Sequence, residues 1–177
     1  EPPSGLVLQY TRSRPMLWQR LDGVLLERLQ VSARSDEERL LADRLAESYV
    51  ALHQHLRQLP LVLVSPDINP SGILRAESDV FLLNWGRWSL DPVGSGWRDG
   101  EKPLGQLSEH LGTASEHRAS LRGLAPESAE LAALAYSFEA KCARQLFADA
   151  FELLPGILDR LDLVRGEAEA EVLEGSQ

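Results

Sequence analysis

The most regular pattern in the chain is a series of apolar residues three or four positions apart, between positions 40 and 56. Polar and charged residues fill most of the positions between them, which is typical of an amphipathic helix with one buried face. Ser35 stands just before this series, and Glu38 follows Ser35 by three residues, the spacing of a capping box at a helix start. The pattern therefore predicts a helix over residues 36–58.

Several stretches carry the residue types and turns of β-structure. The runs "LVLQY" at 6–10 and "LVLV" at 61–64 are short and rich in β-forming apolar residues, so each is predicted as a strand. The stretch "GILRAESDVFLLNWG" at 72–86 is predicted as a β-hairpin, with "AESD" as the turn between "ILR" and "VFLL". Residues 89–106 are rich in glycine and proline, so an irregular connection is predicted there.

The other segments have helical patterns. A helix is predicted in "WQRLDGVLLERL" at 18–29, weakened by one internal glycine, and 106–122 is predicted to be helical in part. A long helix is predicted over 126–154, interrupted by Pro155 and followed by a short helix in "GILDRLDLV". The tail at 165–177 is acidic and lacks an apolar face, so we expect it to fray or to be disordered.

Composition narrows the class of protein. The 177 residues, 44% of them hydrophobic, suffice for one domain with a sizeable core. A net charge of −9 argues against a nucleic-acid partner, which needs a basic face. No apolar run is long enough to cross a bilayer and no secretory signal is visible, so no membrane association is expected. The single cysteine, Cys142, excludes an internal disulfide, is expected in the core, and indicates a reducing, cytoplasmic location.

A family resemblance covers residues 45–97. The helix "LAESYVALHQHL", the loop "SPDINPSGIL" and the turn "LLNWGRW" follow one another without gaps, and together resemble the C-terminal lobe of aminoglycoside-phosphotransferase-like kinases. In this resemblance Asp67 falls on the catalytic aspartate and Asn84 on a metal-binding aspartate. Gly72 falls where a metal-binding asparagine belongs. The stretch "DPVGSGW" from Asp91 resembles the G-D-P-A-x-D-L-A stretch that follows in the family.

The resemblance extends backwards to "GLVLQYTRSRPM", which looks like the last strand of an N-terminal lobe and the hinge after it. It implies that Gln9 and Tyr10 lie where an adenine would bind, within a hinge-like segment at 1–15. It also implies a mainly α (α+β) fold: a kinase-like C-lobe over 1–164, with a small β-hairpin carrying the catalytic-loop-like segment and an acidic flexible tail after it. A Gly-rich loop and a phosphate-binding lysine would be missing, because neither of the two lysines precedes position 102.

The replaced residues bear on the chemistry that the resemblance implies. Phosphoryl transfer depends on positioning and on neutralising charge, with Mg²⁺ held across the phosphates by oxygen ligands. Gly72 has no side-chain oxygen, and Asn84 keeps an oxygen but loses the negative charge. Asp67 then marks a vestigial general-base position. We therefore expect no enzyme activity and no cofactor, and interpret the chain as a pseudokinase-type domain that binds or scaffolds.

Two alternatives stay open at this point. The chain could be an active small-molecule or protein phosphotransferase that uses ATP and Mg²⁺, with its N-lobe outside this chain or its metal site altered at Asn84. It could also be a structural or assembly protein that uses the surface of the lobe alone. A genuine start near residue 1 would favour the pseudokinase and structural interpretations over the active enzyme.

Three expectations about arrangement follow. Asp67 and Asn84 should face one cleft, because both ends of a hairpin return to the same edge. A missing N-lobe would bare an apolar patch and so favour a protein partner or self-association; the patch residues would be Leu6, Leu8, Leu74 and Leu83. Arg12, Arg14 and Arg20 are expected to be solvated charges, with a patch for phosphate or an acidic partner as the alternative.

Overall fold

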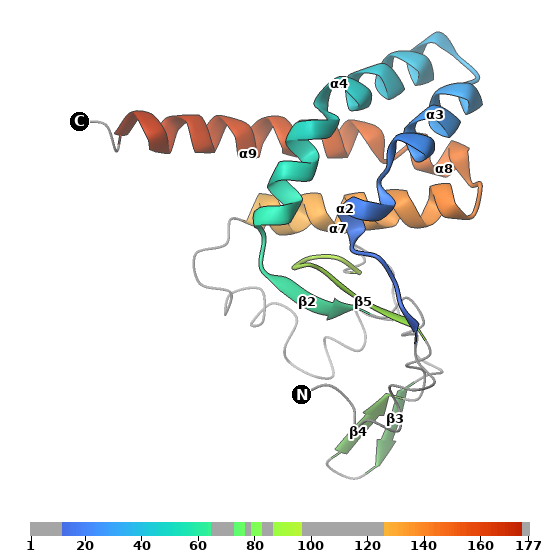
Figure 1. Cartoon of the computed structure of the whole chain (residues 1–177), viewed down its shortest axis with the longest axis vertical. Helices are drawn as coiled ribbons and strands as arrows, with labels where there is room; N and C mark the ends of the chain where they lie inside the picture. The colour runs from blue at the N-terminus through green and yellow to red at the C-terminus, as the bar shows by residue number, and fades with distance from the viewer. Residues whose placement is uncertain (1–11, 65–72, 77–78, 83–86, 97–125, 175–177) are drawn as a thin grey trace.

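The computed structural model describes residues 12–64, 73–76, 79–82, 87–96 and 126–174, and the structural statements below refer to these residues. Their backbone is mainly helical with small β-sheets, which confirms the predicted fold class at the level of a mainly α protein. The helices lie together at one end of the described body and the strands at the other (Figure 1).

Helix α4 (Asp36–Gln58) begins and ends where the sequence predicts it. The Ser35 hydroxyl accepts a hydrogen bond from the backbone N–H of Glu38 at 3.1 Å, and the Glu38 carboxylate accepts one from the N–H of Arg34 at 2.6 Å. These two bonds fix the entry of the chain into the helix and satisfy an N–H group that has no partner inside it.

The single helix predicted over 18–29 is instead two helices, α2 (Leu17–Arg20) and α3 (Gly23–Ser32). The side chain of Asp22 caps α3, accepting a hydrogen bond from the N–H of Leu25 at 2.8 Å. The cap lets the chain start a new helix at the glycine in a new direction. The glycine therefore opens a helix rather than weakening the middle of one.

The helix predicted over 126–154 is wrong in its length. The segment instead belongs to three helices: α7 (Pro126–Ala143), α8 (Phe147–Phe151) and α9 (Leu154–Glu174). Pro155 does not interrupt a helix. It lies in the first turn of α9, where its missing N–H has no intrahelical partner to lose. Helix α9 continues well past residue 164, across the predicted boundary between domain and tail.

Helix α7 ends in a turn that was not predicted from the sequence. Gln145 adopts a φ of 61°, in the left-handed region. The N–H of Leu146 then donates to the carbonyl of Lys141 at 2.9 Å, and the N–H of Gln145 donates to Cys142 at 3.0 Å. This pair of bonds is a Schellman motif, in which glycine usually takes the left-handed position.

Strands β1 (Arg12–Ser13), β5 (Arg87–Pro92) and β2 (Leu61–Val64) form a three-stranded sheet in the order β1-β5-β2. β1 is parallel to β5 and β2 is antiparallel to it. The prediction of β2 is confirmed. The irregular connection predicted from residue 89 is wrong at its start, because residues 89–92 belong to β5 and pair with β2.

Strands β3 (Ile73–Ala76) and β4 (Asp79–Leu82) form the predicted antiparallel hairpin, closed by the pairing of Ala76 with Asp79. The strand predicted at 6–10 and the partial helix at 106–122 lie outside the described residues.

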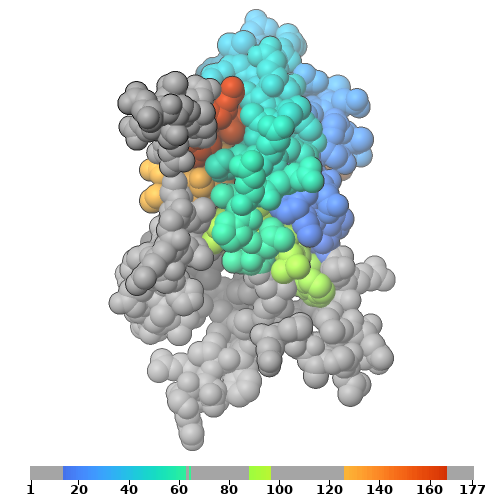
Figure 2. Space-filling model, turned by 60° about the vertical axis from the view of Figure 1, so that its left-hand side comes forward, coloured from blue at the N-terminus to red at the C-terminus, as the bar shows by residue number. Residues whose placement is uncertain are grey.

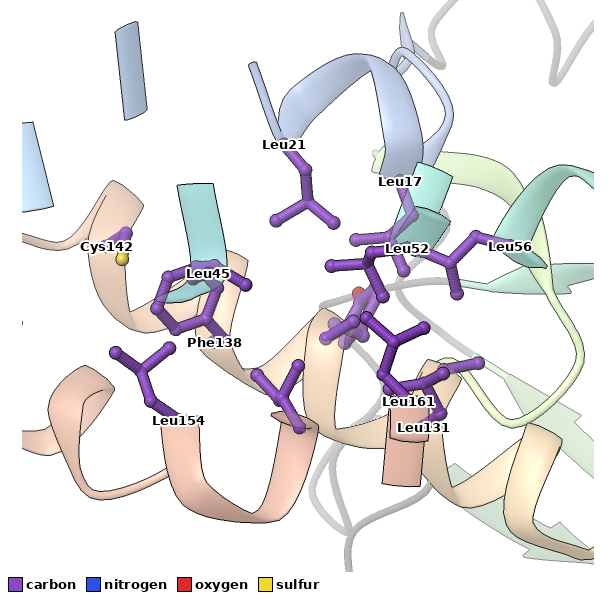
Figure 3. Close-up of a cluster of buried hydrophobic side chains, with 14 of the residues drawn as sticks. Leu17, Leu21, Leu45, Leu52, Leu56, Leu131, Phe138, Cys142, Leu154 and Leu161 are labelled. Carbon is purple, nitrogen blue, oxygen red and sulfur yellow. The ribbon is translucent and has the colours of Figure 1, made fainter. Parts of the chain in front are cut away.

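One hydrophobic core joins α2, α4, α7 and α9. Figure 3 shows its side chains converging from these elements; those labelled are Leu17, Leu21, Leu45, Leu52, Leu56, Leu131, Phe138, Cys142, Leu154 and Leu161. Helix α4 forms much of one face of the described body, with β2 at its lower end (Figure 2). No helix in the described ranges combines the length and the apolar character needed to cross a membrane.

Candidate functional site

The residues to which the sequence assigns chemistry lie outside the described residues: Gln9, Tyr10, Asp67, Gly72 and Asn84. The expected approach of Asp67 to Asn84 therefore stays a prediction, as does the expected apolar patch. What the structure describes is the framework that flanks these positions.

The described strands bring the flanks of the predicted loop next to the flanks of the predicted turn. Val64, the last residue of β2, pairs with Ser89 of β5. Ile73, the first residue of β3, pairs with Leu82, the last residue of β4. In both pairs, one residue adjoins the segment containing Asp67 and the other lies close in sequence to the turn containing Asn84.

A buried carboxylate lies on the strand that follows this turn. Asp91 of β5 is 0% exposed. Its carboxylate accepts hydrogen bonds from the backbone N–H of Leu17 at 2.6 Å, from two guanidinium N–H groups of Arg20 at 3.2 Å each, and from the Ser89 hydroxyl at 2.5 Å. These donors replace the water that burial removes from the carboxylate.

A second buried carboxylate, Glu139 of α7, shares the same arginine. Nε of Arg20 lies 3.0 Å from Oε2 of Glu139, although the geometry is an ion pair rather than a directed hydrogen bond. Nη2 of Arg14 lies 3.4 Å from the same oxygen. The side chains of Arg20 and Glu139 are only 8% and 5% exposed. We call these five residues the buried cluster: Arg14, Arg20, Ser89, Asp91 and Glu139.

The buried cluster corrects the expectation that the N-terminal arginines are solvated. Arg20 is buried and paired with two carboxylates, and Arg14 is partly buried and paired with one of them. The side chain of Arg12 lies outside the described residues. Neither described arginine is available as a phosphate-binding patch, because internal carboxylates already occupy both.

The environment keeps Arg20 charged. Burial lowers the pKa of Arg20, but the charges of Glu139 and Asp91 raise it, and the net shift is upward. The guanidinium carbon lies 5.6 Å from the ring centroid of Tyr136, within the range of a cation–π contact. Burial also raises the pKa of Tyr136, whose hydroxyl has no hydrogen-bond partner among the described residues.

The loop after β5 is fixed against α7. The N–H of Val93 donates to the carbonyl of Pro60 at 2.8 Å, which extends the contact between β5 and the chain before β2. Gly94 follows with a φ of +99°, and a Cβ there would lie 2.0 Å from the carbonyl oxygen of Ala129. Only glycine fits this approach of two backbones.

A cavity of about 310 Å³ lies beside the buried cluster. Its charged lining is Arg20, Asp22, Arg28 and Glu139, and its apolar lining comes from α3, α7 and α8. Two positive and two negative groups balance each other, so the lining selects no ligand by its charge.

Three further ionisable side chains lie outside the buried cluster, Cys142 of α7 and two histidines of α4. Cys142 is buried in the core as predicted, and burial raises its pKa to about 12. Nε2 of His53 lies 2.7 Å from the carbonyl oxygen of Leu21, and burial lowers the pKa of His55. In the part of the chain that the structure describes, no group of three His, Cys, Asp or Glu side chains is placed to hold a metal ion.

The buried cluster was not predicted from the sequence. Asp91 stood out only as part of a stretch with a family resemblance, and nothing local marks Arg20 or Glu139 as its partners. The one available signal is an aspartate at the end of a strand followed by proline, which is weak because such residues usually mark turns.

No protein-family model matches this chain, and no curated protein or solved structure matches it either. The kinase-like resemblance therefore stays a prediction from the residues themselves.

Proposed function

We propose that this chain is a degenerate phosphotransferase-like domain, of pseudokinase type, which acts by binding or scaffolding rather than by transferring phosphate. The order of the described elements supports the proposal: α4 and then the hairpin β3–β4 follow one another as the resemblance implies. The finer fold assignment, a kinase-like C-lobe, belongs to the same proposal.

One observation carries the proposal. The strand pairings bring the flanks of the loop and of the turn together, so the two metal-binding positions of the family would share one site. Those positions hold Gly72 and Asn84, which together offer one neutral oxygen ligand. A magnesium ion bridging phosphates depends on few protein ligands, so the loss of one ligand and one charge should leave nucleotide binding weak.

The surface of the sheet supports a protein partner or a second copy of the chain. Leu61 of β2 and Leu90 of β5 are 43% and 41% exposed. They belong to neighbouring strands that lead into and out of the predicted site, where exposed apolar side chains favour a contact surface. The single thiol of Cys142 fits a reducing, cytoplasmic location.

Calorimetric titration with ATP and Mn²⁺ tests the proposal. The wild-type chain should bind weakly or not at all. The double variant Gly72→Asn/Asn84→Asp restores both ligands and should bind Mn²⁺-ATP at least about tenfold more tightly, since one charge-assisted contact is worth about that much.

The matched control is Asn69→Asp, which adds the same negative charge to the loop at a position that the resemblance does not assign to the metal. Micromolar, metal-dependent binding by the wild type would favour the active phosphotransferase instead. A double variant that gains no more affinity than the control would show that the family alignment of these positions is wrong.

A further inference from the structure

Residues 12–20 are tied to strand β5 along the length of the strand. The N–H of Arg14 donates to the carbonyl of Trp88 at 2.7 Å, next to the parallel pairing of β1 with β5. Further along, the N–H of Leu17 donates to the carboxylate of Asp91 at 2.6 Å. Backbone contacts thus hold the first half of the strand, and contacts of the Asp91 side chain hold the second.

The same segment is tied to α7 through Glu139, which pairs with Arg14 and Arg20. Arg20 is therefore the only described cation in contact with two buried carboxylates at once, those of Asp91 and Glu139. Withdrawing Arg20 would leave both carboxylates buried without their cation, and such a state is strongly destabilised. Residues 12–20 thus cannot leave the body by a small local movement.

Strand β5 in turn depends on residues 12–20 to stay paired and buried. On the core side it presents Ser89 and Asp91, which are polar and fully buried. Three of the donors to Asp91, the N–H of Leu17 and two N–H groups of Arg20, come from residues 12–20. If the segment moved away, the Asp91 carboxylate would lose these donors while still buried. The strand would then have to open as well, so that water could hydrate the carboxylate.

We infer that residues 12–20 and strand β5 form one cooperative unit, so that a partner that displaces the segment also releases the strand that follows Asn84 in the sequence. The segment follows the hinge-like residues, and β5 follows the predicted metal turn, so the unit connects the two regions where contacts are expected. The cooperative unit rests on the described contacts alone, and its connection to the hinge-like residues and the metal turn rests on the proposed function.

Hydrogen exchange of the full chain, followed by mass spectrometry, tests this coupling. Amides that exchange through one shared opening respond to a perturbation by the same factor. In Asp91→Asn, which keeps the shape of the side chain but removes its charge, the amides of Arg14 and Arg20 and those of β5 that pair with β2 should all exchange faster by one common factor of at least about tenfold. The amides in the middle of α9 should not change.

The matched control is Arg160→Gln, which removes the ion pair with Glu130, a contact of 2.7 Å between side chains that are 35% and 42% exposed. This control should leave the exchange of residues 12–20 and of β5 as in the wild type. A response of β5 without residues 12–20, or the reverse, would overturn the inference.

Two further measurements keep the test decisive if Asp91→Asn does not fold. Arg14→Gln removes only the outer contact with Glu139, and should raise the exchange of both segments by one smaller common factor. In the wild type, exchange in low urea should give both segments the same opening free energy and the same dependence on urea. Different values would contradict a shared opening.

Discussion

Gly94 lies between β5 and α7 in a backbone conformation that other residues rarely adopt. In Gly94→Ala the new Cβ would meet the backbone of Ala129, which cannot rotate away as a side chain can. We expect a loss of about 2–4 kcal/mol in the free energy of unfolding, combining a left-handed φ with overpacking. Urea denaturation measures it.

The matched control is Gly166→Ala, inside α9, where a Cβ meets nothing within 4 Å. There alanine should stabilise the chain by about 0.5–1 kcal/mol, because it lowers the entropy cost of helix formation. Equal effects from the two substitutions would contradict the close approach at Gly94.

The burial of Cys142 predicts how stability depends on pH and how fast the thiol reacts. Burial raises its pKa from 9.0 to about 12, so the native thiol keeps a proton that the unfolded chain releases. The resulting stabilisation is present below about pH 9 and is lost as the pH rises towards 12. At pH 8 a maleimide should label the native chain at least about a hundredfold more slowly than the chain in urea, because reaction needs an exposed thiolate. Equal rates would show that the thiol is not buried.

At the scale of elements, the start of α4 offers a direct test of capping. Ser35→Ala removes the oxygen that accepts the N–H of Glu38, and should lower the free energy of unfolding by about 1 kcal/mol. Ser32→Ala is the control, because its hydroxyl only donates to the carbonyl of Arg28 within α3. It should change stability by less than about 0.5 kcal/mol. If both substitutions had the same effect, the capping role of Ser35 would be refuted.

The elements that the sequence predicts well are those whose signals are local. Helix α4 carries its apolar face and its cap within its own residues, and the hairpin β3–β4 carries its turn. The break after α7 is different, because Gln145 takes a position usually held by glycine and is held there by its surroundings. Strand β5 was missed because its pairing partners and the groups that neutralise Asp91 come from distant parts of the chain.

In the candidate site too, the features with a local sequence signal could be predicted and those made by distant residues could not. The spacing of the motif around Asp67 and Asn84 can be found in the sequence, and so can the glycine at position 72, where the resemblance places a metal-binding asparagine. The ion pairs of Arg20 could not be found, since a charged residue in a short helix gives no sign of the buried carboxylates that it meets in the folded chain.

At the scale of the whole molecule, a helical core supports a small sheet whose strands flank the predicted loop and turn. The buried cluster joins three parts of this framework: residues 12–20, strand β5 and helix α7. Under the proposed function, these contacts would keep the shape of the domain after the metal ligands were replaced, because the buried cluster contains neither Gly72 nor Asn84.

The central claim is that this chain does not transfer phosphate, and a transfer assay with radiolabelled ATP tests it most directly. Electrostatic stabilisation is usually the largest catalytic contribution, whereas a general base such as Asp67 contributes only about 10²- to 10⁴-fold. With Mg²⁺ or Mn²⁺ present, release or transfer of label by the wild-type chain should equal that of Asp67→Ala. Metal-dependent transfer that disappears in Asp67→Ala would contradict the claim and identify the chain as an active phosphotransferase.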